Sequence, residues 1–413
     1  MTVHDLRTAT TQTARATLAA VPGVPNWRED DILTRARRVA AVAAQHADAV
    51  DREARFPAEA IAAAKAEGLM GVLAPAALGG EGASHGEVVE VCYLLGQACA
   101  SAAMIYAMHQ VKAACVVRHG LGSHWHEAFI RRMVADQLLL ASSTTEGRAG
   151  GNVRSSAAPV TYAGGRIGLE RDASVISYGL EADALVTTAR RAADAAPSDQ
   201  VLLILDKADY TLTLTRTWET LGMRGTASTG FALKADADVA QIMPQPYEAI
   251  HAQSMVPAAH LFWGAAWAGV AASATERARR FIRKAARGAG GQLPPAAGYL
   301  TKAMASLRAL RALLAGVLER YEAIQDDPEA LAALDFQSAV NLLKVDVSEL
   351  AVETVTAAMR ATGLSGYRND SEASLGRHLR DVLSAPIMIN NDRILTNLAA
   401  ASLVADLPQS IRN

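Results

Sequence analysis

Hydrophobic and polar positions divide the chain into three stretches of different texture. From residue 28 to about 135, apolar residues recur three and four positions apart, as in "DDILTRARRVAAVAAQHADAVDREA". This spacing is typical of helices that bury one face. A longer segment, "GEVVEVCYLLGQACASAAMIYAMHQVKAACVVRHG", is apolar almost throughout, and it predicts buried helices with a break near Ala100.

The middle stretch, residues 137–248, follows a different pattern. Short runs rich in Val, Leu, Ile and Thr alternate with turn residues, which is typical of an antiparallel sandwich or barrel. The runs that predict strands are "QLLLASST", "PVTYAG", "ALVTTAR", "VLLILD", "YTLTLTRT" and "GFALKADADV".

The last stretch, residues 249–405, returns to helical spacing. Long helices joined by short links predict an antiparallel bundle. The expected helices cover about 258–287, 297–325, 329–362 and 385–405.

These three stretches together predict an α+β fold class. We expect an N-terminal helical domain (28–136), a middle antiparallel β-domain (137–248) and a C-terminal four-helix-type domain (249–405). The chain has 413 residues, of which 51% are hydrophobic and 20% charged, with a net charge of −2. This composition is ordinary for a soluble protein, and it excludes the strongly basic surface that nucleic acids or anionic membranes attract.

The three cysteines lie in apolar helical segments and lack the spacing of metal ligands. We expect buried thiols in a reducing compartment, and no metal site. No run of 18 apolar residues marks a membrane span. The expected protein is therefore soluble and cytoplasmic, without a nucleic-acid or membrane partner.

One polar and glycine-rich segment stands out, "SSTTEGRAGGNVRSS" (142–156), directly after the apolar run "LLLA". It places hydroxyl groups and bare backbone amides at the end of a predicted strand. Such a loop is common by itself, but here it belongs to an ordered series of motifs. The series is "GLMGVLAPAALGGEG" (68–82), "TTEGRAGGNV" (144–153), "VISYGLEADALV" (175–186), "LGMRGTAST" (221–229), "GLSGY" (363–367) and "GRHLRDVLSA" (376–385).

This series, within the order helices, strands, helices, resembles the acyl-CoA dehydrogenase superfamily of flavoproteins over about residues 28–405. The resemblance implies the fold of that superfamily and FAD as the cofactor. It also implies a homo-oligomer, a dimer or a tetramer, because members share FAD across a subunit interface. Hydroxyls and glycines near the flavin ring, a glycine loop at the pyrophosphate and arginines at a neighbouring subunit's FAD are implied as cofactor contacts. These residues are Ser142, Ser143, Thr144, Thr145, Gly150, Ser177, Arg283, Arg287, Gly363 and Gly366.

The catalytic glutamate of the dehydrogenases has no counterpart at either of its familiar positions. After "RDA", the position falls on Ile389 in "RDVLSAPIMINNDRIL". The alternative position, on the first long C-terminal helix, falls on or near Ala259, and no acid lies between Gln253 and Ala274. Neither isoleucine nor alanine takes a proton, so the base that removes a proton beside a thioester carbonyl is missing from both places.

Three residues are candidates for a relocated base. Asp392 follows Ile389 by about one helical turn, His260 adjoins Ala259, and His109 lies on the apolar helix "MIYAMHQV". Each has a structural alternative, since Asp392 suits a helix cap and a histidine in an apolar segment suits the core.

The resemblance leaves three functions open. The first is dehydrogenation of an acyl thioester, with electron-transfer flavoprotein as the partner. The second is a flavin-dependent monooxygenase, which takes reduced FMN or FAD from a flavin reductase and hydroxylates a small amine, phenol or sulfur compound with O₂. The third is a flavoprotein that acts only as an interaction partner. Three residues are expected to bind substrate: Gly151, where the superfamily holds the thioester carbonyl, and Asn390 and Asn391 in the polar "INND".

Overall fold

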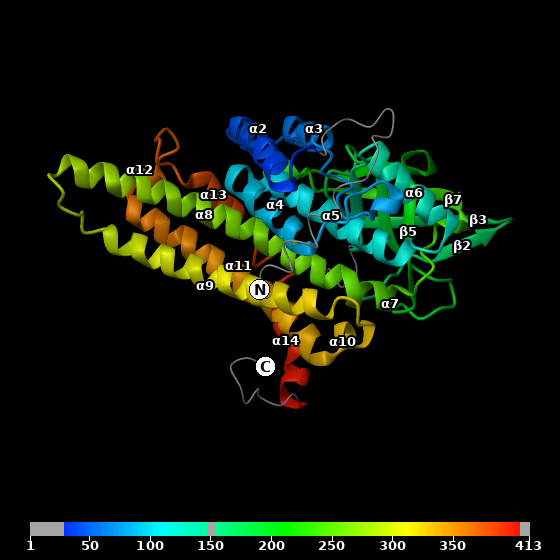
Figure 1. Ribbon diagram of the computed structural model, residues 1–413. Coiled ribbons are helices and arrows are strands. Elements are labelled where there is room, and N and C mark those ends of the chain that lie inside the picture. Colours follow the sequence, from blue (N-terminus) through cyan, green and yellow to red (C-terminus); the bar gives the residue numbers. More distant parts are fainter. Residues whose placement is uncertain (1–28, 147–153, 405–413) are drawn as a thin grey trace, which may run out of the picture.

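The computed structural model describes residues 29–146 and 154–404, and it has the order predicted from the sequence (Figure 1). Helices come first, a β-domain follows, and the chain ends in helices. The predicted fold class is therefore confirmed. The N-terminal helices are α2 (Ile32–Glu53), α3 (Ala58–Ala66), α4 (His85–Ala98), α5 (Ala100–Gly120) and α6 (His124–Ala135).

Local chemistry explains where these helices begin. The Asp31 side chain accepts a hydrogen bond from the backbone N–H of Thr34 and so caps α2. Ser84 and Glu87 form a reciprocal capping box at the start of α4. Cys99 has an extended backbone, with φ −148°, and separates α4 from α5. The predicted break near Ala100 is thus one extended residue.

The β-domain contains two sheets. One has the strand order β1-β4-β5 and the other β2-β3-β7-β6. All pairings are antiparallel except that of β1 with β4, which is parallel. This departs from a wholly antiparallel sandwich, because β2 and β3 leave for the second sheet before the chain returns to pair with β1. The strands are β1 (Leu140–Ser143), β2 (Val160–Ala163), β3 (Arg166–Ile176), β4 (Ala184–Arg190), β5 (Gln200–Asp206), β6 (Tyr210–Arg216) and β7 (Thr229–Asp238).

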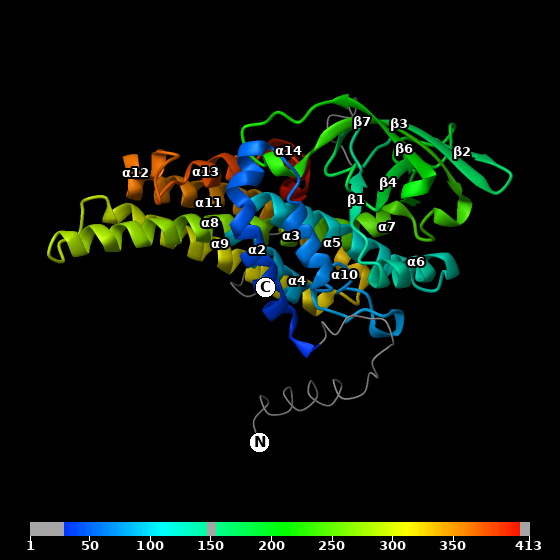
Figure 2. The ribbon, with the colours of Figure 1, turned by 90° about the horizontal axis from the view of Figure 1, so that it is seen from above.

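The C-terminal region is built on three long helices that run side by side and extend away from the sheets (Figures 1 and 2). These are α8, α9 and α11. A short helix α7 and a π-helical segment (His251–Met255) continue directly into α8. The helices are α7 (Tyr247–Ile250), α8 (Val256–Gly288), α9 (Ala297–Ile324), α10 (Pro328–Ala332), α11 (Leu334–Thr362), α12 (Leu364–Tyr367), α13 (Gly376–Val382) and α14 (Asn391–Val404).

Helix α8 lies in the core, in contact with α4, α5, α9 and α11. Two glycines bring α8 and α4 together backbone to backbone: a Cβ at Gly96 would meet the Ala266 carbonyl oxygen at 2.2 Å, and one at Gly269 would meet the Tyr93 carbonyl oxygen at 2.3 Å. Among the described residues, the helical stretch Tyr247–Gly288 is long and apolar enough to cross a membrane, and most of it is buried inside the protein. This burial is typical of a core helix.

Candidate functional site

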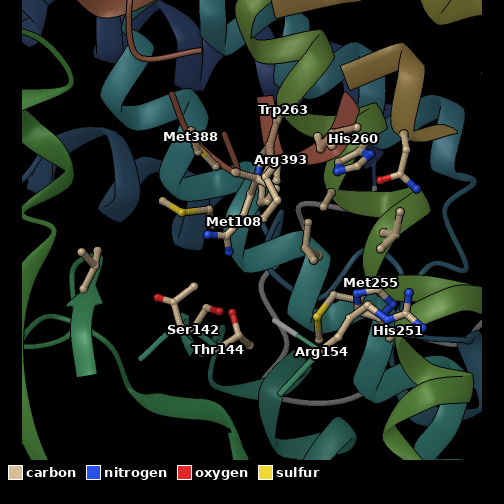
Figure 3. A pocket seen from close by; sticks show the side chains of 18 of the residues that line it. Met108, Ser142, Thr144, Arg154, His251, Met255, His260, Trp263, Met388 and Arg393 are labelled. Atoms are coloured by element: carbon tan, nitrogen blue, oxygen red, sulfur yellow. The ribbon is translucent and has the colours of Figure 1, made fainter. Parts of the chain in front are cut away.

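A cavity of about 1670 Å³ lies where the helices meet the β-domain (Figure 3). Helix α5, the end of β1, the turn before β7, the segment from α7 into α8 and the start of α14 all contribute side chains. Helix α5 contributes Met104, Met108, Val111 and Lys112, whose spacing places them on one face of the helix. The cavity is thus bounded by elements that are far apart in the sequence.

The strand β1 directs its hydroxyls to opposite sides. Ser142 of β1 and the following Thr144 and Thr145, which the resemblance predicted near a flavin ring, line the cavity. Ser143 does not line it, because successive side chains of a strand point to opposite faces. Its side chain is fully buried and its Oγ has no hydrogen-bond partner among the described residues. The expected cofactor contact of Ser143 is therefore not supported by its position.

A chain of three hydroxyls crosses the cavity wall beside the sheet. The Ser177 Oγ lies 2.7 Å from the Ser228 Oγ, which lies 2.7 Å from the Thr226 Oγ1. Thr226 donates to the Met223 carbonyl oxygen at 2.9 Å. Because a carbonyl only accepts, Ser228 donates to Thr226 and Ser177 donates to Ser228, so the Ser177 oxygen is left as an acceptor.

Ser177 was expected at a flavin, whereas Ser228 and Thr226 were missed by the sequence analysis. Both line the cavity. The signal was present in "GTAST", which places three hydroxyls within five residues after a turn. Such a cluster of hydroxyls is common in loops, so the sequence alone does not mark it as part of a site. The hydrogen bond between Ser228 and Ser177 does.

His260 lines the cavity with a defined tautomer. Its Nδ1 donates to the Val340 carbonyl oxygen at 2.9 Å, so Nε2 carries no proton in the neutral ring. Burial lowers the pKa of His260 to about 4. The ring is therefore neutral at physiological pH, with an unprotonated Nε2, and Trp263 stands beside it in the wall (Figure 3).

His109 is held away from the cavity by the backbone. Its Nδ1 accepts from the Leu140 N–H at 3.0 Å, and its Nε2 lies 2.8 Å from the Met70 carbonyl oxygen, to which it donates. Burial lowers its pKa to about 4. Both ring nitrogens are engaged and His109 does not line the cavity. Its expected catalytic role is thus unsupported, and its position is structural.

The segment before α14 places Ile389 in the cavity wall. Ile389 has φ +48°, a left-handed conformation that a β-branched residue adopts only under strain. Its carbonyl oxygen accepts from the Lys344 Nζ at 3.1 Å, and the same ammonium donates to the Asn391 Oδ1 at 2.6 Å. Lys344, which is fully buried, fixes this strained turn.

Three residues expected in this segment do not reach the cavity. Asn391 is buried and bonded to Lys344, Ser348 and Glu349. Asn390 and Asp392 are exposed, and the Asn390 side chain accepts from the Asp392 N–H at the start of α14. None of the three lines the cavity. Substrate contact by the asparagines and a base at Asp392 are therefore not supported.

Carboxylates are scarce in the cavity. Among the described residues, those that line it are Asp199 and Glu248. Asp199 pairs with Arg191, and Glu248 is exposed. Ala259, the alternative glutamate position, also lines the cavity. No described carboxyl group stands at either familiar base position.

Positive charge is more abundant. Lys112, Arg154 and Arg393 line the cavity, and Figure 3 shows Arg393 beside Met108 and Arg154 beside His251. The Arg393 Nη1 is buried without a partner among the residues that the structure describes. His251, missed by the sequence analysis, also lines the cavity, and burial lowers its pKa to about 4.

The remaining expected cofactor residues lie far from this cavity. Arg283 and Arg287 are exposed on α8, and Arg283 is roughly 35 Å along the helix from His260 at 1.5 Å per residue. Gly363 lies between the C-terminal end of α11 and the start of α12, and Gly366 lies within α12 (Figure 1). One chain does not bring these residues to the cavity. Gly150 and Gly151 lie outside the described residues.

Comparison with known proteins gives the family. The model of the acyl-CoA dehydrogenase N-terminal domain matches residues 28–134, and that of the C-terminal domain matches residues 253–404. These two matches flank the β-domain and cover most of the chain. The chain therefore belongs to the acyl-CoA dehydrogenase superfamily. A search of curated proteins finds no match.

Solved structures share the fold at low sequence identity. FMN-bound TdsC from Paenibacillus sp. A11-2 is 18% identical over 92% of this chain and 100% of its own, with a TM-score of 0.80. The nitrososynthase from Micromonospora carbonacea var. africana is 21% identical over 95% and 99%, with a TM-score of 0.78. Butyryl-CoA dehydrogenase from Megasphaera elsdenii is 16% identical over 94% and 100%, also with a TM-score of 0.78. The fold is thus common to enzymes of different reactions.

Proposed function

We propose that this protein is a flavin-dependent monooxygenase of the acyl-CoA dehydrogenase fold. The observation that carries the proposal is the cavity wall at Ile389 and Ala259, where a dehydrogenase would need a carboxylate. The neighbours include a dibenzothiophene monooxygenase, TdsC, and a nitrososynthase. Bound reduced flavin would supply the electrons that activate O₂ for transfer of one oxygen atom to the substrate.

The hydroxyl groups of the cavity fit a flavin ring. The Ser177 oxygen is an acceptor because its proton is used toward Ser228, and it suits a ring N–H. Ser142 and Thr144 can donate to ring carbonyl or nitrogen acceptors from β1 and the residue after it. The donor and acceptor set therefore matches the edge of an isoalloxazine.

The remaining wall would bind the substrate and exclude water. Met104, Met108, Met388 and Trp263 provide an apolar surface, and Ile389 adds to it where a glutamate is absent. Exclusion of water protects a reactive oxygen species from wasteful decay. His260 Nε2 would accept the proton that the substrate releases when it takes up the oxygen atom. The imidazole suits this role because it is neutral and its Nδ1 is held by the Val340 carbonyl oxygen.

The test compares the two reactions on one flavin-loaded preparation. Anaerobic addition of acyl-CoAs from four to sixteen carbons should leave the flavin absorbance unchanged. With a flavin reductase and ¹⁸O₂, a panel of phenols, aromatic amines and thiophenes should give at least one product that carries ¹⁸O. Bleaching of the flavin by any acyl-CoA would overturn the proposal.

Dehydrogenation of an acyl thioester is the second candidate, and His260 favours it. His260 adjoins Ala259, lines the cavity and has an unprotonated Nε2. In that case some acyl-CoA bleaches the flavin, and His260→Gln abolishes the bleaching while flavin stays bound. Bleaching that survives His260→Gln would exclude this base.

The cofactor and the assembly are proposed together. FAD, unlike FMN, has a second phosphate and an adenosine, which would extend beyond the cavity toward Arg283 and Arg287 of another subunit. A homo-oligomer would bring those residues into reach. Electron-transfer flavoprotein would accompany the dehydrogenase, and a flavin reductase the monooxygenase.

A further inference from the structure

We infer that the cavity takes a substrate with a negatively charged group, and that Lys112 binds that group. This rests on the proposed function only in treating the cavity as the substrate site. The substrate class would be a small organic acid, with a carboxylate or another oxyanion, rather than a cationic amine.

The first observation is the isolation of the Lys112 ammonium. Lys112 lines the cavity and is only 4% exposed. Its one hydrogen bond runs from Nζ to the Met255 Sδ, 3.6 Å away. A thioether is a weak acceptor, so among the described residues the ammonium has no partner that compensates for its burial.

The second observation is that Cys115, Tyr247 and His251, which lie near Lys112, carry no negative charge. Burial, with the nearby Arg154 and Lys112, keeps the pKa of His251 at about 4. Burial raises the pKa of the Cys115 thiol to about 11, and it raises that of the Tyr247 hydroxyl above its usual value. Cys115, Tyr247 and His251 therefore offer no negative charge to Lys112 near neutral pH.

A second buried lysine shows how this fold satisfies an ammonium that has a structural role. The Lys344 Nζ donates to the Ile389 carbonyl oxygen at 3.1 Å and to the Asn391 Oδ1 at 2.6 Å. Both acceptors are oxygen atoms of the protein, and Lys344 does not line the cavity. Among the described residues Lys112 has no such oxygen acceptor, and it lines the cavity, so an anionic ligand there would supply the partner that the protein supplies to Lys344.

The placement of Lys112 also gives a direction to the ligand. Met104 and Lys112 are eight residues apart on one face of α5, roughly 12 Å along its axis. Met108, between them, lies beside Arg393 and Trp263, whereas Met255, the contact of Lys112, lies beside His251 and Arg154 (Figure 3). A substrate anchored at Lys112 would extend along α5 toward His260 and Trp263.

The test uses Lys112→Met in the full-length, flavin-loaded protein. Methionine keeps the unbranched side chain and removes the charge, so the variant should fold and its melting temperature should not fall. Benzoate, glutarate and inorganic phosphate are titrated by calorimetry, with benzamide and glutaramide as uncharged counterparts. Lys302→Met, on the surface of α9, is the control.

At least one anion should bind wild type and Lys302→Met saturably, and its uncharged counterpart should bind weakly. Lys112→Met should lose about tenfold or more in affinity for that anion, as expected for a charge-assisted hydrogen bond. Equal binding to Lys112→Met, or no saturable binding of any anion to wild type, would overturn the inference. Loss of flavin from Lys112→Met, without an anion effect, would assign the ammonium to the cofactor phosphate and also overturn it. The calorimetry needs no turnover, so failure of the oxygenase assay leaves its result intact.

Discussion

His109 and His260 illustrate how much a single residue type can differ in role. Both are buried, and burial lowers the pKa of each to about 4. His109 uses both ring nitrogens to join Met70 to Leu140, whereas His260 uses one and lines the cavity. The number of ring nitrogens already occupied, rather than burial, separates the structural histidine from the candidate catalytic one.

Acid should destabilise the fold through these histidines. A folded-state pKa of about 4, below the unfolded value of about 6.5, means that the unfolded chain binds more protons between those two values. The stability is therefore complete above pH 6.5 and is lost as pH falls toward 4, by on the order of 3 kcal/mol for each such histidine.

Urea unfolding at several pH values measures this effect. His109→Gln should reduce the pH slope of the free energy of unfolding by up to one proton, while the exposed His124→Gln should leave it unchanged. An unaltered slope in His109→Gln would contradict the assignment.

The hydroxyl chain allows a second test at single residues. Ser228→Ala removes the acceptor of the Ser177 proton, so the Ser177 oxygen is no longer fixed as an acceptor. Flavin retention on dialysis should weaken by about five- to tenfold, or about 1 to 1.4 kcal/mol. Ser143→Ala is the matched control, because its hydroxyl is buried, unbonded within the described chain and outside the cavity. Equal retention in the two variants would remove the hydroxyl chain from the cofactor site.

Among elements, the helices and most strands could be predicted from periodicity, but β3 could not. It alternates buried and exposed residues, yet the buried face includes Arg171, which donates to the Thr188 carbonyl. A charged residue in an inward position disguises the two-residue period. The cavity was likewise only partly predictable: Ser177 followed from the resemblance, whereas Lys112 and His251 became visible only when distant elements met.

The glycine contact between α4 and α8 makes a prediction about these elements. Gly269→Ala would place a Cβ 2.3 Å from the Tyr93 carbonyl oxygen, and the helix backbones would have to separate. The free energy of unfolding should fall by about 3 kcal/mol, in the upper range for overpacking. Because α8 carries His260 and Trp263, flavin retention should fall too.

Gly316→Ala is the control for that substitution. It lies within α9, and a Cβ there meets nothing within 4 Å. Alanine should stabilise this helix by about 0.5–1 kcal/mol, since glycine is the poorer helix former. Chemical denaturation of both variants should give effects of opposite sign. A neutral Gly269→Ala would mean that α4 and α8 tolerate a wider separation.

At the scale of the whole molecule, the resemblance implied a cofactor site shared between subunits, and within one chain its expected residues lie in two places. Ser142, Thr144, Thr145 and Ser177 line the cavity. The other expected residues, Arg283, Arg287 and Gly363, lie toward the far ends of α8 and α11. Sequence order carries no information on which copy of a chain supplies a residue. The proposed homo-oligomer would bring the two sets of residues together without moving any helix.

The separation predicts different behaviour of two flavins. The double variant Arg283→Gln/Arg287→Gln should lose about tenfold in affinity for FAD, because arginine–phosphate contacts are charge-assisted, and little for FMN. Fluorescence titration of each flavin measures both values. Arg308→Gln, on the exposed face of α9, should change neither. An equal loss of affinity for FAD and FMN would mean that the two arginines do not contact the part of FAD that FMN lacks.

The π-helical segment His251–Met255 sets the phase between two walls of the cavity. Each α-helical residue advances the side-chain direction by about 100°. A π-helical turn closes its hydrogen bond over one residue more than an α-helical turn does. Deleting one residue there would leave the sequence of α8 intact but rotate Tyr247 relative to His260. Tyr247 and His260 therefore face the same cavity only because the segment between them contains the extra residue of a π-helical turn.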